Sequence, residues 1–302
     1  MQGTSTIARP EVVSAARLRR PANPYLTTLR RLAPSPSGAL GLTVAGLLVL
    51  TAVFAPLIAT HDPLAQHPGA ELSGPSARYL VGTDEFGRDL FSRIVYGSRI
   101  SLFVGVVAVM IGGLVGVSTG LAAGYRGGWL DASIMRVWDT LLAFPAILLG
   151  IAVATVLGPG VTNAAIALAI ISIPQFSRIT RASVLGEKQR EYVEAARAIG
   201  VGDLRIALRH IFPNTVSPLL VQLSLAMAYA VLLEAGLSFL GLGTQPPDPS
   251  WGSMLNTSRA YLRQAPWYAV FPGIALSVLL LGLNFLSDAL RDALDPKLTH
   301  LR

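Results

Sequence analysis

The sequence predicts an all-α polytopic membrane protein with six transmembrane helices, and two observations lead to this prediction. The first is composition: of 302 residues, 52% are hydrophobic and only 14% are charged, and the mean hydropathy is +0.55. This balance is too apolar for an ordinary soluble domain. The second is that the apolar residues form blocks of about 20 residues, the length that a helix needs to cross a bilayer.

Uncharged blocks define the expected spans. They are residues 40–59, 100–124, two shorter helices within 140–177, 215–233 and 264–287. The Leu-Gly-Pro-Gly sequence at 157–160 predicts the turn between the third and fourth spans. The fourth span, 161–177, contains Pro174, which membrane helices tolerate because neighbouring groups satisfy the freed carbonyl.

The basic residues predict the orientation of these spans. Of the 24 lysines and arginines, 18 lie in the two terminal segments and in the loops after the second and fourth spans. The positive-inside rule therefore places both termini and the fourth loop in the cytoplasm. Because the charge is spread over loops, the basic pI indicates topology and no nucleic-acid partner. Residues 1–37 are too long and too Arg-rich for a signal peptide, so we expect a cytoplasmic tail.

Several classes of chemistry are excluded by residue type. The chain has no cysteine, which rules out disulfides, thiolate metal sites and cysteine nucleophiles. Its four histidines are scattered along the sequence and predict no metal site. They are His61, His67, His210 and His300.

Two features of the spans have competing interpretations. Glycines at 112, 116, 120 and 124 share one face of the second span, which allows close approach of another helix, either in a transport bundle or as generic membrane packing. Glu234, at the outer end of the fifth span, is the one ionisable residue placed to line a pathway or gate. A carboxylate near the interface is more often simply hydrated.

The two longer outward loops also carry patterns. Apolar residues at 86, 90, 91, 94 and 95 predict an amphipathic helix along the membrane surface, with Thr83 or Asp84 as its N-cap. The acidic residues there lack the spacing of a calcium loop. The later loop, 243–252, is stiffened by proline, and Trp251 and Trp267 suit an interfacial aromatic belt.

A charged insert separates the fourth and fifth spans. Residues 189–199 are good helix formers, and Gly200 is placed to end that helix with a positive φ. Asp203 predicts the cap of a second short helix that runs to about His210 and ends at Pro213. Two short helices at a glycine turn favour a docking surface for a cytoplasmic partner; the alternative is a solvated charged loop.

This insert resembles a known signature. The sequence Glu194-Ala195-Ala196, with Gly200 and the group from His210 to Asn214, is similar to that of binding-protein-dependent ABC importer permeases. The stretches 82–89, 237–243 and 246–255 resemble one branch of that family, the C-type permease of dipeptide, oligopeptide and nickel importers. The resemblance extends from about residue 38 to about residue 297.

The resemblance implies a type I ABC importer permease fold in which the insert, about 186–214, is the coupling helix region. It implies an N-terminal tail (1–37), a first span with an outer loop (38–97), a permease core (98–290) and a cytoplasmic C-terminal tail (291–302). The residues implied to contact the ATPase are Glu194, Ala195, Ala196, Gly200, His210 and Pro213. The residues implied to shape an outer docking surface are Gly82, Thr83, Asp84, Gly87, Arg88 and Asp89.

The implied function is half of a translocation pathway for short peptides in a bacterial or archaeal cytoplasmic membrane. The implied partners are a B-type permease, two ATP-binding subunits that use ATP and Mg, and an extracytoplasmic solute-binding protein. The chain itself is no enzyme and binds no cofactor: its only lysines, Lys188 and Lys297, do not follow a glycine as a P-loop requires. Alternatives are nickel or another small solute, a stand-alone secondary transporter that uses Glu234 to carry a proton, and a scaffold subunit.

Overall fold

The computed structural model describes residues 35–294, so the predictions for the N-terminal tail up to residue 34 and for 295–302 lie outside the described residues. In the described part, the regular elements are helices, and the only backbone bridge joins Thr83 to Asp89. The elements are α2 (Pro36–Val53), α3 (Ala55–Ile58), α4 (Leu90–Arg126), α5 (Gly128–Leu142), α6 (Ala146–Leu157), α7 (Val161–Glu187), α8 (Glu191–Ala198), α9 (Asp203–Arg205), η1 (Ile206–Ile211), α10 (Phe212–Phe239), α11 (Trp251–Ser258), η2 (Arg259–Tyr261) and α12 (Trp267–Leu294).

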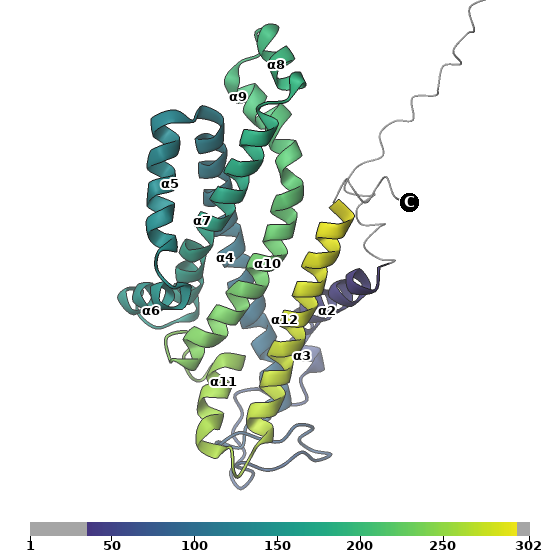
Figure 1. Ribbon diagram of the computed structural model, residues 1–302. Helices are drawn as coiled ribbons and strands as arrows, with labels where there is room; N and C mark the ends of the chain where they lie inside the picture. The colour runs from purple at the N-terminus through teal and green to yellow at the C-terminus, as the bar shows by residue number, and fades with distance from the viewer. Residues whose placement is uncertain (1–34, 295–302) are drawn as a thin grey trace, which may run out of the picture.

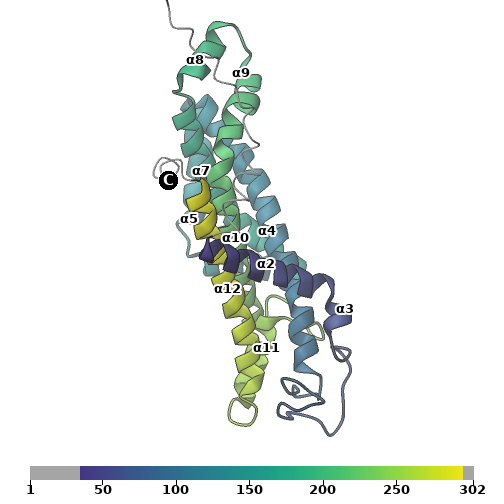
Figure 2. The same ribbon diagram turned by 90° about the vertical axis from the view of Figure 1, so that its right-hand side faces the viewer.

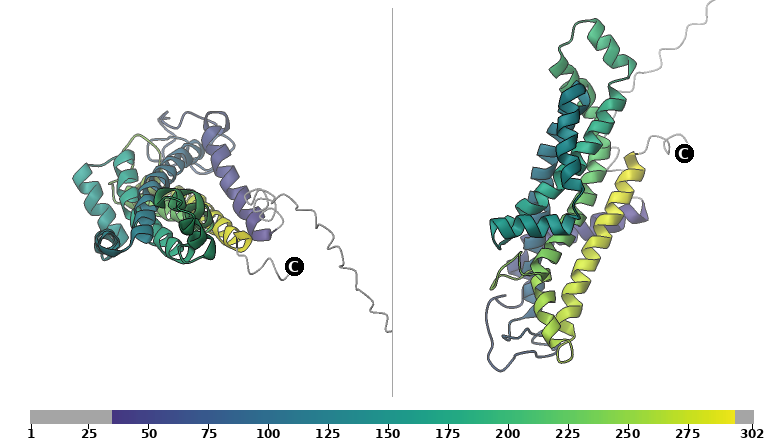
Figure 3. Two further views of the ribbon diagram at one scale, coloured as in Figure 1. Left: turned by 90° about the horizontal axis from the view of Figure 1, so that it is seen from above. Right: turned by 60° about the vertical axis from the view of Figure 1, so that its left-hand side comes forward.

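The long helices α4, α7, α10 and α12 run along the molecule (Figure 1). At one end lie α8 and α9, and at the other lie α11 and the loop between α3 and α4. Seen along the bundle, α5 and α6 lie on one side and α2 and α12 on the other (Figure 3). The all-α prediction is confirmed. The division of the chain at residues 37, 97 and 290 stays a prediction, and α4 crosses residue 97 without a break.

The predicted count of six spans is only partly confirmed. Among the described helices, α2, α4, α10 with the short elements before it, and α12 are long and apolar enough to cross a membrane. A fifth span is formed if α5 and α6 count together, although they meet at an angle of 92°. α7 is 27 residues long but does not meet the same criterion of apolar composition.

The break between α5 and α6 has a local cause. Pro145 immediately precedes α6, and a residue that precedes a proline is driven away from helical conformation. α5 has no buried residue of its own. It is fastened to α7 by ion pairs, because Arg181 donates to both oxygens of Asp131 at 2.5 and 2.6 Å and Arg178 donates to Asp139 at 2.6 Å.

The glycine face of α4 packs directly against α7. Gly112, Gly116, Gly120 and Gly124 are all buried. A Cβ atom at Gly116 would lie 2.5 Å from the Ile173 carbonyl oxygen and 2.6 Å from the Phe176 Cβ. The close helix approach predicted from the glycine spacing is therefore present, and it occurs inside this chain.

Gly116→Ala is expected to destabilise the protein by about 1–3 kcal/mol, because the added methyl group forces α4 and α7 apart. The measurement is the thermal unfolding midpoint in mild detergent. Gly113→Ala is the matched control, since a Cβ there would meet the Phe176 ring at an ordinary 3.9 Å. Equal midpoints for the two variants would contradict the contact.

α2 crosses α12 obliquely on the outside of the bundle (Figure 2). Two glycines make this crossing close: a side chain at Gly41 would collide with the backbone of Leu286, and one at Gly282 would collide with Val44. The first span is thus attached chiefly through α12, and much of its surface remains exposed and apolar.

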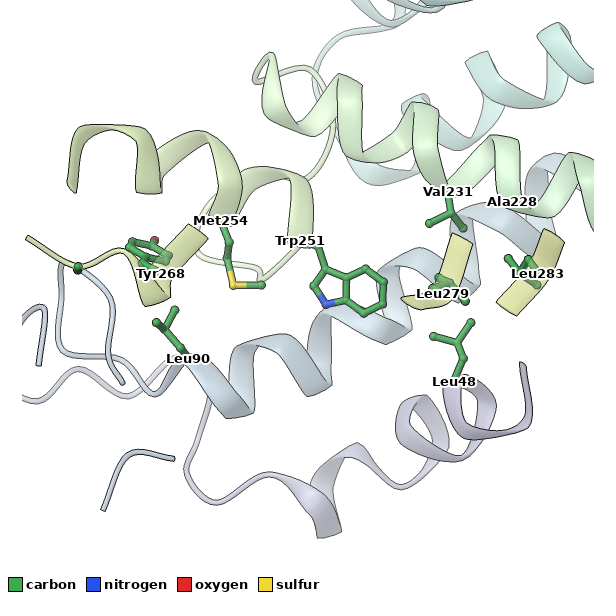
Figure 4. Packing of buried hydrophobic residues seen from close by; sticks show 10 residues of the cluster. Leu48, Leu90, Ala228, Val231, Trp251, Met254, Tyr268, Leu279 and Leu283 are labelled. Carbon is green, nitrogen blue, oxygen red and sulfur yellow. The ribbon is translucent and has the colours of Figure 1, made fainter. Parts of the chain in front are cut away.

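Trp251 is the centre of the core that joins the helices (Figure 4). Its side chain, carried by α11, is 4% exposed and belongs to one buried cluster with Leu90, Val231 and Leu279. Its indole Nε1 donates to the Ile94 carbonyl at 2.9 Å. The expectation that Trp251 belongs to an interfacial belt is wrong, because the indole seals α11 against α4.

Candidate functional site

The insert between α7 and α10 is a folded unit at one end of the molecule (Figure 1). It has a small apolar core of its own, whose buried members are Val184, Val193, Ala196, Ile206 and Ile211. Leu121 and Tyr125 of α4 pack against this core. The alternative of a solvated charged loop is therefore wrong, since such a loop would bury no cluster of this kind.

The turn at Gly200 has the predicted geometry. Gly200 has a φ of +77°, which residues other than glycine rarely adopt. Its amide donates to the Arg197 carbonyl at 2.9 Å, and the Val201 amide donates to the Ala196 carbonyl at 3.0 Å. These two bonds form a Schellman motif, which satisfies carbonyls at the end of α8.

The second half of the insert differs from the prediction. The N-cap of α9 is Gly202 instead of Asp203, and after three residues the chain continues as the π-helix η1. Pro213 does not end a helix but lies in the first turn of α10, directly after η1. His210 is half-buried in η1, with Nδ1 3.3 Å from the Arg205 carbonyl oxygen.

The surface of the insert is partly as predicted. Glu194 and Ala195 are exposed, whereas Ala196 is buried in the insert core and cannot present its small side chain to a partner. The sequence interpretation missed Ile199 and Leu204, which are 81% and 74% exposed on either side of Gly200. We call the surface formed by Glu194, Ala195, Ile199, Gly200 and Leu204 the insert tip. Exposed apolar groups bordered by charge mark an interaction site.

At the opposite end, residues 82–89 form a compact loop that is held together by buried polar side chains, which we call the knot. The side chains of Thr83, Asp84 and Asp89 are fully buried, and Arg88 is 6% exposed. Asp84 accepts hydrogen bonds from the amides of Phe86 and Arg88, both at 2.9 Å, and from Arg88 Nε at 2.6 Å. Arg88 and Asp84 thus hold the loop's shape from inside.

The predicted amphipathic helix over 83–95 is wrong in its first half. Asp89 is the N-cap of α4: its carboxylate accepts from the Ser92 amide at 2.9 Å, the Ser92 hydroxyl at 2.6 Å and the Thr60 hydroxyl at 2.8 Å. Gly82 and Gly87 have positive φ angles of +88° and +70°, which interrupt a helix before that point. The helix therefore begins at Leu90 and continues into the second span.

Glu234 lies inside the protein near the loop end of α10. It is 1% exposed, so the expectation of a hydrated carboxylate is wrong. The Ser238 hydroxyl donates to Glu234 Oε1 at 2.6 Å, and the Thr244 amide donates to the Ser238 hydroxyl at 3.0 Å. This chain of bonds fastens the segment after α10 to the helix. A role of Glu234 in a pathway or gate stays a prediction.

Comparison with known families matches residues 116–300 to the family described as "Binding-protein-dependent transport system inner membrane component". The chain belongs to this family. Residues 24–75 of the permease match the "N-terminal TM domain of oligopeptide transport permease C". These two matches confirm the resemblance to C-type permeases.

Curated relatives are similar to the permease over most of its length. It is 44% identical to a dipeptide transport system permease protein DppC of Alkalihalophilus pseudofirmus, covering 91% of each chain. It is 45% identical to a di/tripeptide transport system permease protein of Pseudomonas aeruginosa, over 87% of this chain and 89% of the relative. It is 48% identical to the glutathione transport system permease protein GsiD of Escherichia coli O6:K15:H31, over 83% of this chain and 84% of the relative.

A solved structure confirms the fold of the permease. The inward-facing MetNI methionine ABC transporter matches with a TM-score of 0.56 and 18% identity, covering 67% of this chain and 96% of that chain. The protein is therefore a multi-pass membrane permease subunit of an ABC importer, and the alternative of a stand-alone secondary transporter is not favoured.

Proposed function

We propose that this permease forms half of the pathway of an ATP-driven importer of short peptides. The proposal of a peptide substrate rests on the relatives, which are named for dipeptides, di/tripeptides and glutathione. No cluster of His, Asp and Glu suited to hold a metal ion occurs among residues 35–294, so the structure adds no support for nickel.

The folded insert is the observation that carries the coupling proposal. Its tip exposes Ile199 and Leu204 beside the charge of Glu194, a surface suited to the groove of a separate ATPase subunit. The permease has no glycine-lysine pair for a phosphate-binding loop. ATP and Mg²⁺ are therefore used by the partner, and the permease receives motion through the insert.

The remaining partners follow from the family and the charge distribution. A homologous B-type permease would complete the pathway, two ATP-binding subunits would lie below, and a solute-binding protein would deliver the peptide. The basic residues favour a cytoplasmic insert and an outward 82–89 loop. The knot around Asp84 would then present an outward surface of fixed shape, with Phe86 exposed on it.

Transport would proceed by alternating access. ATP binding closes the ATPase pair, brings the two coupling inserts together and opens the pathway outward; hydrolysis reverses the change. No covalent step is required of the permease.

Co-purification in mild detergent tests this proposal. The tagged permease is purified from its native host, and the bound proteins are identified by mass spectrometry beside a Glu194→Arg variant. We expect a P-loop ATPase and a second permease with the natural sequence, and loss of the ATPase with the variant. Recovery of the permease without any ATPase, or equal recovery with the variant, would contradict the proposal.

A further inference from the structure

One hydroxyl group joins the insert to two membrane helices. Tyr192 of α8 donates a hydrogen bond to Glu187 Oε2 at 2.6 Å, at the last residue of α7. The same hydroxyl accepts a hydrogen bond from Asn214 Nδ2 at 3.0 Å, in the first turn of α10. We call these three side chains the Tyr192 clasp. Because the acceptor is a carboxylate, the bond to Glu187 is of the stronger, charge-assisted kind.

The Tyr192 hydroxyl is suited to remain a donor. Burial and the hydrogen bond to Glu187 raise the pKa of Tyr192 above its ordinary value. The group therefore stays protonated at neutral pH and can donate to Glu187, with the His210 carbonyl oxygen as a second, longer acceptor at 3.3 Å.

The clasp lies beside an irregular segment of the insert. Between α9 and α10 the backbone forms the π-helix η1, in which the Phe212 amide reaches back five residues to the Ala207 carbonyl. Such wide turns are rare and occur mostly as local irregularities at functional sites. The His210 carbonyl in this segment accepts from Asn214 Nδ2 at 2.9 Å, so Asn214 connects η1 to the clasp as well.

A second tyrosine connects the insert to α4. The Tyr125 hydroxyl donates to Asp203 Oδ1 at 2.7 Å, at the start of α9. The Tyr125 carbonyl accepts from Lys188 Nζ at 2.6 Å, just after α7. α4 is thus joined to α9 and to the residue after α7 independently of the clasp. The insert is therefore connected to α4 as well as to α7 and α10.

We propose that Tyr192 is a positioning residue that makes the insert and the ends of α7 and α10 move as one body, so that displacement of the insert tip reaches the membrane helices. This inference rests on the proposed coupling to an ATPase. Without the clasp, the insert would tilt about η1 when the tip is pulled, and ATP would be hydrolysed with little movement of α7 and α10. Tyr125 supports the same body from α4.

Transport per ATP in the reconstituted importer tests this role. The complete complex, with its solute-binding protein, is placed in liposomes, and dipeptide uptake and phosphate release are measured together. For Tyr192→Phe, which removes only the hydroxyl, we expect about tenfold less uptake per ATP, equivalent to about 1.4 kcal/mol of lost coupling. Glu187→Leu should behave alike, whereas Glu187→Gln keeps an acceptor and should retain coupling.

The matched control is Tyr261→Phe, since the Tyr261 hydroxyl makes no hydrogen bond with any residue from 35 to 294. Unchanged uptake per ATP in Tyr192→Phe would overturn the inference, and so would a proportional fall of uptake and hydrolysis. The ATPase must still co-purify with Tyr192→Phe. If the ATPase co-purifies with Glu194→Arg as well as with the natural sequence, the proposed coupling itself fails. If Glu194→Arg loses the ATPase while Tyr192→Phe keeps it and transports normally, only the role of the Tyr192 clasp is refuted.

Discussion

Glu194→Arg is expected to abolish solute uptake while the permease still inserts into the membrane. Glu194 is exposed in the first turn of α8, and among residues 35–294 its carboxylate makes no hydrogen bond or ion pair. Reversal of its charge therefore leaves the insert core in place and changes the surface offered to the ATPase. The measurement is uptake in cells, with the amount of permease in the membrane fraction determined by immunoblot.

Asp288→Arg provides the matched control for this charge reversal, because Asp288 is an exposed carboxylate on α12. Its uptake should stay within about twofold of normal, since exposed charges away from an interface contribute little. Normal uptake by Glu194→Arg would refute the assignment of the insert tip as the ATPase contact.

Gly200→Val is expected to have the same outcome for a different reason. A Cβ at Gly200 would meet nothing within 4 Å, so the effect comes from its φ of +77° alone. A branched side chain there costs about 1–3 kcal/mol and shifts the turn between α8 and α9. Gly202→Val is the control, because Gly202 has an ordinary φ of −65° and equally open surroundings. Equal uptake by the two variants would contradict this account.

Asp84→Ala is expected to produce the largest loss of stability. The substitution leaves Arg88 buried without its 2.6 Å partner and removes the acceptor of two backbone amides. Breaking a buried pair in this way costs about 3–5 kcal/mol. The thermal unfolding midpoint in detergent and the rate of proteolysis of the loop should both change strongly.

Glu71→Ala tests whether any carboxylate in that loop has such an effect. Glu71 accepts a hydrogen bond from the Gly69 amide at 2.9 Å on the exposed surface, so its loss should lower the midpoint only slightly. If the midpoint of Asp84→Ala equals that of Glu71→Ala, the knot does not stabilise the outer end as described.

Four of the predicted spans and the insert were predictable because their signals are local. A block such as 100–124 has no charge, and glycines four residues apart define one helix face whatever packs there. Gly200 could be placed because helix-forming residues precede it. These features depend on neighbouring residues in the chain alone.

The errors arise where distant contacts decide the structure. The spacing of Leu90, Ile94 and Val95 does belong to a helix, but the helix begins only after its N-cap Asp89, because Thr60 and the turn at Gly87 fix that point. Ala195 and Ala196 are equivalent in sequence, and only the burial of Ala196 in the insert core separates them. The bend before α6 lay inside an uncharged block, where only Pro145 could have indicated it.

Dependence of transport on the ATPase is the central claim, and uptake of a labelled dipeptide into liposomes tests it most directly. The permease is reconstituted alone and as the complete complex with its solute-binding protein, each with and without ATP and Mg²⁺. We expect accumulation only in the complete complex supplied with ATP. Movement of dipeptide by the permease alone, without ATP, would contradict it.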